Sequence, residues 1–259
     1  MRGVGYNGID VLRRCLTSAR AEDTAQSGWA ATRTHGLVMR ILTQHPYHCQ
    51  SQAPFLIGRE MPLHHYDAHA FARHIRLVSA NTQRPFVIAL DGRSGVGKST
   101  LALQMTDVLG AAIIDGDDFF AGGTALRSDA PALRAADCID WTHQRAVLDV
   151  LRQGRAASWR AFDWDAFDGR LQSSVTELSP RSVVILEGVY SARPELADLI
   201  DMKVLVTVSD ALREARLLAR EGSIDPWERQ WHEAEAHYFN EVMPWGRFEV
   251  ILDAVNANE

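Results

Sequence analysis

One glycine-rich segment constrains this chain more than any other. Residues 92–99 read GRSGVGKS, which satisfies every fixed position of the pattern G-x-x-x-x-G-K-[ST]. An apolar run at residues 85–91 precedes it, and a helical pattern from Lys98 follows it. A glycine-rich turn between a buried strand and a helix N-terminus directs backbone N–H groups inward, where they can hold an anion. The segment therefore predicts an α/β fold with a phosphate-binding loop.

The predicted nucleotide site extends from Gly92 to Thr100. The Lys98 ammonium group would contact the terminal phosphates of a nucleoside triphosphate, and the Ser99 hydroxyl would bind Mg²⁺. We therefore expect ATP and Mg²⁺ as cofactors. The alternative is a glycine-rich turn with an incidental lysine. The predicted cofactor-binding residues are Gly92, Arg93, Ser94, Gly95, Val96, Gly97, Lys98, Ser99 and Thr100.

Short apolar runs recur along the chain and alternate with helical patterns. Runs of this kind are typical of parallel strands that are buried on both faces. The fold class that we expect is α/β, with a doubly wound, mainly parallel five-stranded sheet, helices on both faces, and ligands at the carboxyl ends of the strands. The five predicted strands are residues 85–91, 111–114, 183–186, 204–208 and 250–252.

Capping residues set the limits of the predicted helices. The first would begin at Asp67 and end near Asn81, and the others are residues 98–109 before Gly110, 141–151 after Asp140, and 212–220 between Asp210 and Gly222. The last would run from a capping box at Asp225, Pro226 and Glu228 to about Val242.

Residues 1–60 are mixed in composition and predict a poorly defined extension before a domain at 61–259. Met39 and Met61 both precede the first convincing element, so we expect that the functional chain could start at either. Loss of activity or solubility on deletion of residues 1–60 would refute that expectation.

Composition and charge exclude several classes of function. The net charge is −6, which disfavours binding to nucleic acid. No stretch approaches the ~20 apolar residues of a membrane helix. Cys15, Cys49 and Cys138 have no paired spacing, which favours a reducing, cytoplasmic setting without a disulfide framework. Nothing in the sequence predicts an oligomer.

Carboxylates follow the second and third predicted strands. Asp115, Asp117 and Asp118 come after residues 111–114, and Glu187 follows residues 183–186. Because the carboxyl ends of parallel strands share one edge of a sheet, these acids are expected beside the loop, where an acceptor hydroxyl would lie. Alternatively, these carboxylates are only polar residues of turns.

The sequence resembles the uridine kinase, phosphoribulokinase and bacterial pantothenate kinase group. The loop has the form G-x-S-G-x-G-K-S, an Asp-Asp-Phe-aromatic tetrad lies at Asp117–Phe120, a Leu-Glu-Gly turn lies at Leu186–Gly188, and an arginine-rich helix follows the fourth strand. The resemblance spans about residues 84–253. It implies an ATP-dependent kinase that transfers the γ-phosphate to a hydroxyl of a small-molecule acceptor.

The resemblance also implies residue roles. Lys98 would act on the phosphates, Asp117 would be the general base, and Glu187 would assist Mg²⁺ or the acceptor. A lid around residues 213–245 would bring Arg216 and Arg220 to the donor phosphates. Alternatively, these arginines form a solvated face paired with Glu214 and Glu221.

An aromatic segment is the predicted acceptor site. Phe162-Asp163-Trp164 is similar to the Tyr-Asp-Phe segment that lies over the nucleobase in nucleoside kinases of the group, and Phe120 would join it. The histidine that follows the triad in that group is replaced by residues 166–168, which read AFD, and this weakens the case for uridine or cytidine. The alternative is a packed cluster on a hairpin. Trp227, Trp231 and Tyr238 are interpreted as core or lid packing.

Three functions stay open. The leading one is a kinase of a nucleoside or similar metabolite. The others are a kinase of a non-nucleoside such as a sugar phosphate, pantothenate or an antibiotic alcohol, and a nucleotide-binding regulatory module. Against the module, the sequence has no Asn-Lys-x-Asp element, and the third strand ends in Glu187-Gly188-Val189-Tyr190 instead of Asp-x-x-Gly.

Overall fold

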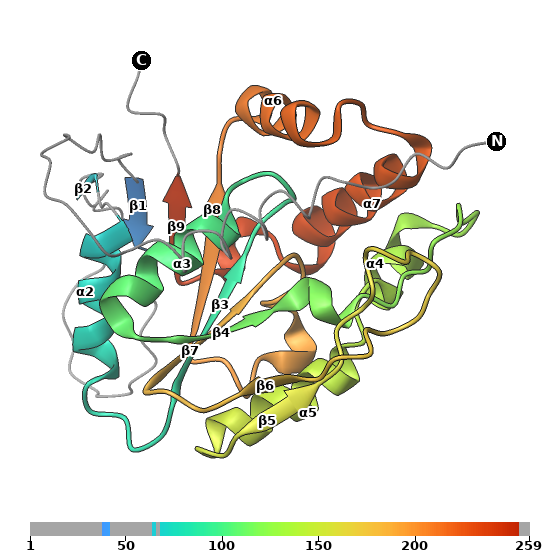
Figure 1. Cartoon of the computed structure of the whole chain (residues 1–259). Coiled ribbons are helices and arrows are strands. Elements are labelled where there is room, and N and C mark those ends of the chain that lie inside the picture. The colour runs from blue at the N-terminus through green and yellow to red at the C-terminus, as the bar shows by residue number, and fades with distance from the viewer. Residues whose placement is uncertain (1–37, 42–63, 66–67, 254–259) are drawn as a thin grey trace, which may run out of the picture.

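The computed structural model describes residues 38–41, 64–65 and 68–253, and its centre is a seven-stranded sheet with the order β2-β1-β9-β8-β3-β7-β4 (Figure 1). The strands of this sheet are β1 (Val38–Ile41), β2 (His64–His65), β3 (Phe86–Asp91), β4 (Ala112–Asp115), β7 (Val183–Glu187), β8 (Met202–Thr207) and β9 (Val250–Asp253). The helices are α2 (Ala68–Ser79), α3 (Lys98–Leu109), α4 (Pro131–Asp137), α5 (Trp141–Arg152), α6 (Asp210–Glu221) and α7 (Pro226–His237).

All five predicted strands are present as parallel neighbours, from β9 through β8, β3 and β7 to β4. The sheet is two strands wider than predicted, because β1 pairs antiparallel with β9 and β2 pairs antiparallel with β1. In this register Val38 lies opposite Asp253 and Ile41 opposite Val250. Four residues within the N-terminal segment therefore cover the β9 edge.

Residues of β3 alternate between the two faces of the sheet. Phe86, Ile88 and Leu90 belong to the core that also contains residues of α2 and α3, whereas Val87 and Ala89 belong to the core that contains residues of α5 and α7. Because both faces are buried, the strand reads as one continuous apolar run. The prediction of helices on both faces is confirmed.

Most predicted helix ends are confirmed. Gly110 adopts φ 60° after α3 and its N–H donates to the Thr106 carbonyl over 2.7 Å. The Asp225 carboxylate accepts the Glu228 N–H at 2.8 Å, so α7 begins at the predicted capping box. The cap of α6 is Ser209 rather than Asp210, since the Ser209 hydroxyl accepts the Leu212 N–H. Asp67, the predicted cap of the first helix, lies outside the described residues.

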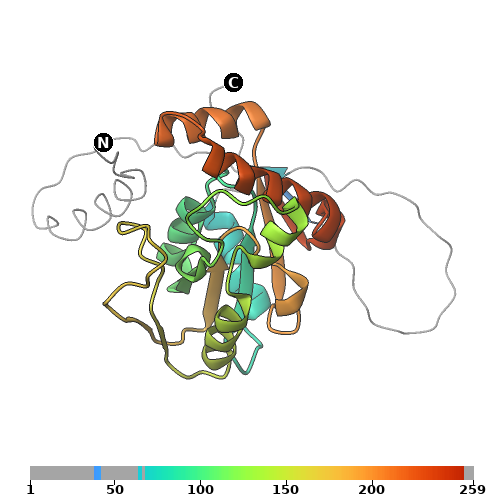
Figure 2. The same cartoon turned by 90° about the vertical axis from the view of Figure 1, so that its right-hand side faces the viewer.

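Two pairs of elements outside the main sheet position the site. Helices α6 and α7 lie above the end of the sheet at which the loop after β3 emerges (Figure 2). Strands β5 (Ala157–Trp159) and β6 (Thr176–Leu178) form a separate antiparallel pair, and the segment between them holds the aromatic residues predicted for the acceptor. The glycine-rich loop thus has a helical cover and an aromatic neighbour.

Candidate active site

The loop at residues 92–99 takes a conformation that requires glycine at three positions. Gly92, Gly95 and Gly97 have φ values of 149°, 85° and 97°, which side chains rarely adopt. A Cβ at Gly92 would also lie 2.3 Å from the Val206 carbonyl oxygen of β8. The loop therefore curls tightly against the sheet and leads directly into the N-terminus of α3, where unpaired N–H groups can bind phosphate.

Lys98 lies inside the curl. Its side chain is buried, and Nζ donates hydrogen bonds to the carbonyl oxygens of Gly92 at 2.9 Å and Arg93 at 3.2 Å. A buried ammonium group beside a glycine-rich loop at a helix N-terminus fits the polyphosphate of a nucleotide. This chain can hold the nucleotide with Lys98 and the loop amides.

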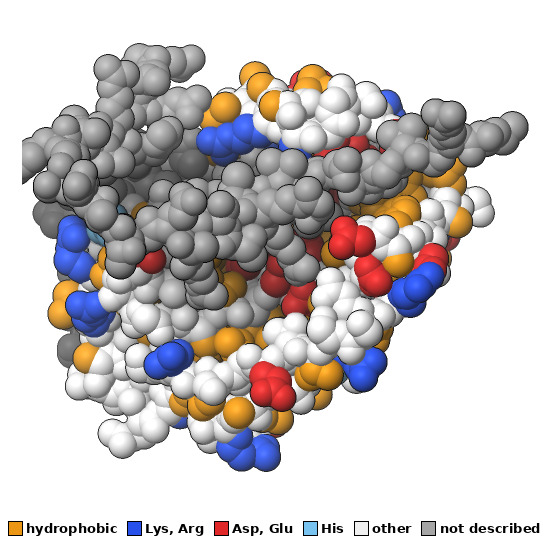
Figure 3. Space-filling model, viewed as in Figure 1, with side chains coloured by type: hydrophobic (Ala, Val, Ile, Leu, Met, Phe, Trp, Pro, Cys, Tyr) orange, Lys and Arg blue, Asp and Glu red, His pale blue; other side chains and the backbone are white. Residues whose placement is uncertain are grey.

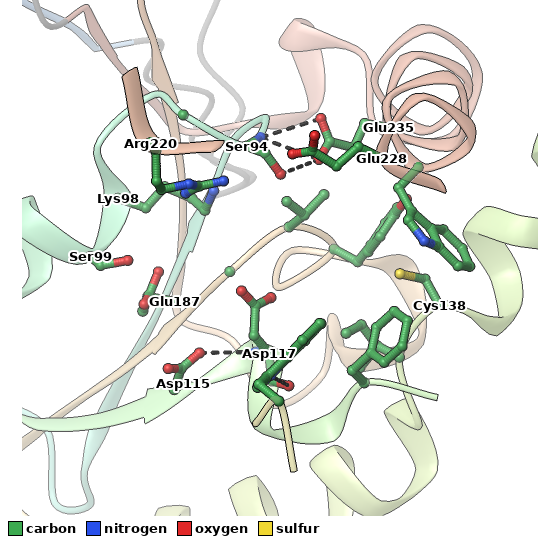
Figure 4. A pocket seen from close by; sticks show the side chains of 18 of the residues that line it. Ser94, Lys98, Ser99, Asp115, Asp117, Cys138, Glu187, Arg220, Glu228 and Glu235 are labelled. Carbon is green, nitrogen blue, oxygen red and sulfur yellow. Dashed lines mark hydrogen bonds between the residues drawn. The ribbon is translucent and has the colours of Figure 1, made fainter. Parts of the chain in front are cut away.

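A pocket of about 450 Å³ extends from this loop (Figure 4). The predicted site residues that line it are Ser94, Gly95, Gly97, Lys98, Ser99, Thr100, Asp117, Phe120, Trp164, Glu187, Arg216 and Arg220. Residues separated by more than a hundred positions in the sequence therefore face one cavity.

The other predicted site residues surround this cavity without lining it. Val96 is buried in the core beside α3, and Arg93 forms ion pairs with Asp210 and Glu235. Phe162 is buried, with its ring 5.0 Å from that of Phe120. The Asp163 carboxylate accepts the Ala166 N–H at 3.0 Å, so it caps a local turn. These side chains support neighbours that do line the cavity.

Glu187 and Asp115 lie beside Ser99 at the ends of adjacent strands (Figure 4). Burial raises the pKa of Glu187 to about 7, although the charge of Lys98 and a hydrogen bond with Ser99 oppose the rise. Burial and then the neighbouring Asp117 and Glu187 raise the pKa of Asp115 well above its usual value. Carboxylates crowded in this way gain from a divalent cation, so Ser99, Glu187 and Asp115 fit Mg²⁺.

Asp117 faces the middle of the pocket (Figure 4). It belongs to a 3₁₀ turn, Gly116–Phe119, whose start is fixed by the Asp117 N–H donating to the Asp115 carboxylate at 3.0 Å. The residue is exposed, and its side chain lines the cavity. Desolvation raises the pKa of Asp117, Lys98 and Arg220 lower it, and Glu235 raises it. A carboxyl group with a raised pKa is suited to accept a proton near neutral pH.

The arginines of α6 meet the loop. Arg216 donates to the Val96 carbonyl at 3.1 Å, and Arg213 donates to the Ser94 carbonyl at 3.3 Å. Arg220 pairs with Glu221 and lines the pocket. The alternative prediction was that these arginines form a solvated face paired with Glu214 and Glu221. It fits Arg220, which pairs with Glu221, but it does not fit Arg216, which contacts the loop.

Two buried carboxylates that sequence reasoning missed hold the loop in place. Asp91 accepts hydrogen bonds from the N–H groups of Gly92, Tyr190 and Ala192 and from the Tyr238 hydroxyl, all at 2.8–3.1 Å. Burial raises the pKa of Asp91 to about 6. The sequence signal that could have identified Asp91 is its position between the apolar strand and the glycine-rich loop.

Glu235 of α7 is the second missed carboxylate. It accepts from the N–H and the hydroxyl of Ser94, as the dashed lines in Figure 4 show. The residue is 3% exposed. No local pattern marks a glutamate in a helix as a partner of a loop that lies 141 positions earlier.

Five rings form an aromatic box at the far side of the pocket: Phe120, Trp164, Phe167, Trp227 and Trp231. Ring centroids lie 4.9 Å apart for Phe120 and Trp164, and 5.0 Å apart for Phe167 and Trp227. Trp227 and Trp231, interpreted from the sequence as core or lid packing, pack together and also line the cavity. Tyr238 is buried and does not line it.

A parallel sheet, a phosphate-binding loop after its central strand, and carboxylates at the next strand ends define a P-loop phosphotransferase. The sequence model of the Phosphoribulokinase / Uridine kinase family matches residues 87–225. The chain belongs to this family and is an ATP-dependent small-molecule kinase.

Known proteins agree with this membership. A uridine kinase of Deinococcus deserti is 28% identical over 145 residues, covering 53% of this chain and 69% of that protein. A uridine kinase of Limosilactobacillus reuteri strain DSM 20016 is 26% identical over 204 residues, covering 68% and 90%. The structure of a "Possible Uridine Kinase" from Bacillus stearothermophilus shares the fold, with a TM-score of 0.54 and 17% identity over 71% of this chain and 96% of that one.

Two kinds of feature are absent from the described residues. None of their helices is both long and apolar enough to cross a membrane. No group of three or more His, Cys, Asp or Glu side chains in that part of the chain is arranged to hold a metal ion.

Proposed function

We propose that this protein transfers the γ-phosphate of ATP to a hydroxyl of a nucleoside, with Mg²⁺ as cofactor, in the cytoplasm. The observation that carries the proposal is the position of Asp117, which lines one cavity together with the loop lysine Lys98 and the aromatic box. A hydroxyl beside Asp117 would have a phosphate site on one side and flat apolar surfaces on the other.

Each residue has a role in this proposal. ATP supplies the phosphoryl group when bound, and Mg²⁺ neutralises its charge. Asp117 would accept the proton of the acceptor hydroxyl, and Lys98 and Arg220 would contact the phosphoryl group that is transferred. Glu187 and Ser99 would hold the cation, and Arg216 would contact the phosphates together with Arg220. Phe120 and Trp164 would stack on the base. Phe162, which packs on Phe120, and Asp163, which caps the local turn, would keep these two rings in position.

We also propose which part of the chain closes over the site. We place the kinase domain at residues 61–259 and its lid around 213–245, which contains α6 and α7. The support is that Arg213, Arg216 and Glu235 all contact the loop from these helices. Closure of such a cover excludes water, which would otherwise hydrolyse the nucleotide.

A second candidate is a kinase of a non-nucleoside alcohol. The segment Ala166-Phe167-Asp168 favours it, because Phe167 occupies the pocket wall and no histidine follows the aromatic triad. Both candidates use the same loop, base and lid.

The test is acceptor-dependent release of ADP from ATP across a panel of nucleosides and other alcohols. A nucleoside is expected to raise the rate, and Asp117→Asn is expected to lower it by about 10²–10⁴-fold because the general base is lost. Circular dichroism and ATP binding serve as controls for folding of the variant.

Three results would contradict the proposal. A non-nucleoside as the best acceptor would favour the second candidate. ADP release that no acceptor increases would favour a regulatory module. A near-normal rate of folded Asp117→Asn would remove Asp117 from the mechanism.

A further inference from the structure

We infer that the acceptor end of the pocket rejects alcohols that carry a phosphate or carboxylate group and accepts uncharged or positively charged ones. The acceptor end consists of the aromatic box and the carboxylates of Asp118, Asp165 and Glu228, all of which line the cavity. This inference rests on the proposed kinase function and narrows its substrate class.

The cationic side chains that line the pocket are engaged on the loop side. Lys98 donates to loop carbonyl groups, and Arg216 donates to the Val96 carbonyl. Arg220 pairs with Glu221 and also lowers the pKa values of Asp117 and Glu228, so several carboxylates share its charge. Burial lowers the pKa of His232, which keeps its ring neutral at pH 7. The described lining residues include no further lysine or arginine.

The carboxylates come from three separate segments. Asp118 is buried and accepts the Trp159 indole N–H at 2.8 Å. Asp165 lies between Trp164 and Phe167 in the chain, and Glu228 follows Trp227 on α7. Neither Asp165 nor Glu228 forms an ion pair within the part of the chain that the structure describes. Burial, then Glu221 and Asp225, raises the pKa of Glu228.

Acidic side chains are visible in the hollow at the centre of the face shown in Figure 3, below the lysine and arginine side chains of the α6 region. Within the pocket, acidic side chains line both the loop side and the acceptor end, whereas the lysine and arginine side chains among the described lining residues come only from Lys98 of α3 and from Arg216 and Arg220 of α6. A phosphate or carboxylate group on the acceptor would lose its hydration in this pocket and would be repelled by the negatively charged side chains at the acceptor end. Both effects disfavour binding of an anionic acceptor.

The box offers favourable contacts to the other acceptor classes. The indole N–H groups of Trp164 and Trp227 donate to the carbonyl groups of Asp117 and Gly123, both at 3.3 Å, which fixes the orientation of their ring faces in the pocket wall. Such faces stack on flat uncharged rings and attract cations. In the same wall, the Trp231 indole N–H and the Tyr190 hydroxyl are buried without a hydrogen-bond partner among the described residues.

The first test compares matched acceptors. Adenosine, cytidine and uridine are assayed against their 3′-monophosphates, which keep the 5′-hydroxyl, beside amino alcohols, pantothenate and glycerate. The parent protein is expected to use only acceptors without an anionic group. Asp165→Asn with Glu228→Gln is expected to reduce the preference for the uncharged member of a pair by about tenfold. Glu177→Gln on β6, an exposed acid outside the pocket, should change nothing.

The second test does not require turnover. Tryptophan fluorescence is quenched with caesium, iodide and acrylamide in a Trp245→Phe background, because Trp245 is 53% exposed away from the pocket. Caesium should quench the tryptophan fluorescence more strongly than iodide does, when each is normalised to quenching by the neutral acrylamide. Quenching by iodide should increase in Asp165→Asn, in Glu228→Gln and in the double variant.

The outcomes separate the inference from the proposed function. A phosphorylated or carboxylated acceptor with the highest kcat/KM overturns the inference, as does iodide quenching that equals caesium quenching and is unchanged in the variants. If no alcohol is phosphorylated, the proposed function fails, and the quenching result alone decides whether the pocket excludes anions.

Discussion

At the scale of single residues, Asp91 links three segments that the chain places far apart. Its oxygens accept four hydrogen bonds, from the start of the loop, from the turn after β7 and from Tyr238. Every partner is a donor, so an amide in place of the carboxylate must turn its NH₂ group toward at least one N–H. A buried donor left unsatisfied in this way is costly.

We therefore predict that Asp91→Asn lowers the free energy of unfolding by about 1–3 kcal/mol. Tyr238→Phe removes one of the four hydrogen bonds and should cost about 1 kcal/mol or less. Urea denaturation of both variants and the parent measures the difference. Equal stability of Asp91→Asn and the parent would show that the carboxylate does not hold the loop.

Glu187 gives a prediction about pH. Its pKa of about 7 in the folded chain exceeds the ordinary value of 4.5, so the folded protein binds this proton more tightly than the unfolded chain. The stabilisation is full below about pH 4.5 and is lost as the pH rises through about 7. Glu187→Gln should remove this dependence, so the parent should lose stability relative to the variant between pH 5 and pH 8.

Denaturation at several pH values without nucleotide measures this difference. Mg²⁺ should act in the opposite direction, because only the ionised carboxylate binds it, so the Mg²⁺ concentration needed for turnover should rise below pH 7. A constant stability difference between parent and Glu187→Gln across this range would contradict the assigned protonation.

At the scale of elements, α7 supplies both the cover of the loop and a wall of the acceptor end. The wall is close-packed, since a Cβ at Gly122 would lie 2.4 Å from Cη2 and 2.7 Å from Cζ2 of Trp231. Gly122→Ala must move this ring within the aromatic box. We predict a higher KM for the acceptor, an unchanged KM for ATP, and a loss of about 1–3 kcal/mol of stability.

Steady-state kinetics with each substrate varied in turn separates the two KM values. Gly246→Ala is the matched control, because a Cβ there meets no heavy atom within 4 Å. Parallel increases in both KM values would mean that α7 moves as a whole and that the effect is not confined to the box.

The sequence predicted elements where a local signal was strong. The capping box at Asp225 and the glycine at Gly110 fixed helix ends within one residue. Helix α4 was missed because it is short and its buried residues, Arg134 and Ala135, make no apolar stripe. It is held instead by its packing on α7, including an ion pair between Arg134 and Glu233 at 2.9 Å.

At the scale of the whole molecule, the parallel sheet could be predicted because burial on both faces makes each strand an apolar run. The pairing of β1 with β9 could not, since four residues in a mixed segment carry little periodic signal. Contacts such as Tyr238 with Asp91 join residues 147 positions apart and depend on tertiary packing. The loop motif therefore marked one side of the pocket, whereas the contacts of α6 and α7 with the loop and the far wall of the pocket required the structure.

The central claim is that the loop at residues 92–99 binds the phosphates used for transfer. It is tested by acceptor-dependent ADP release by Lys98→Ala, compared with Lys203→Ala, a substitution on β8 that removes an ion pair with Glu249 away from the pocket. We predict that the rate of Lys98→Ala falls to background, whereas Lys203→Ala keeps the parent rate. An undiminished rate in folded Lys98→Ala would contradict the account.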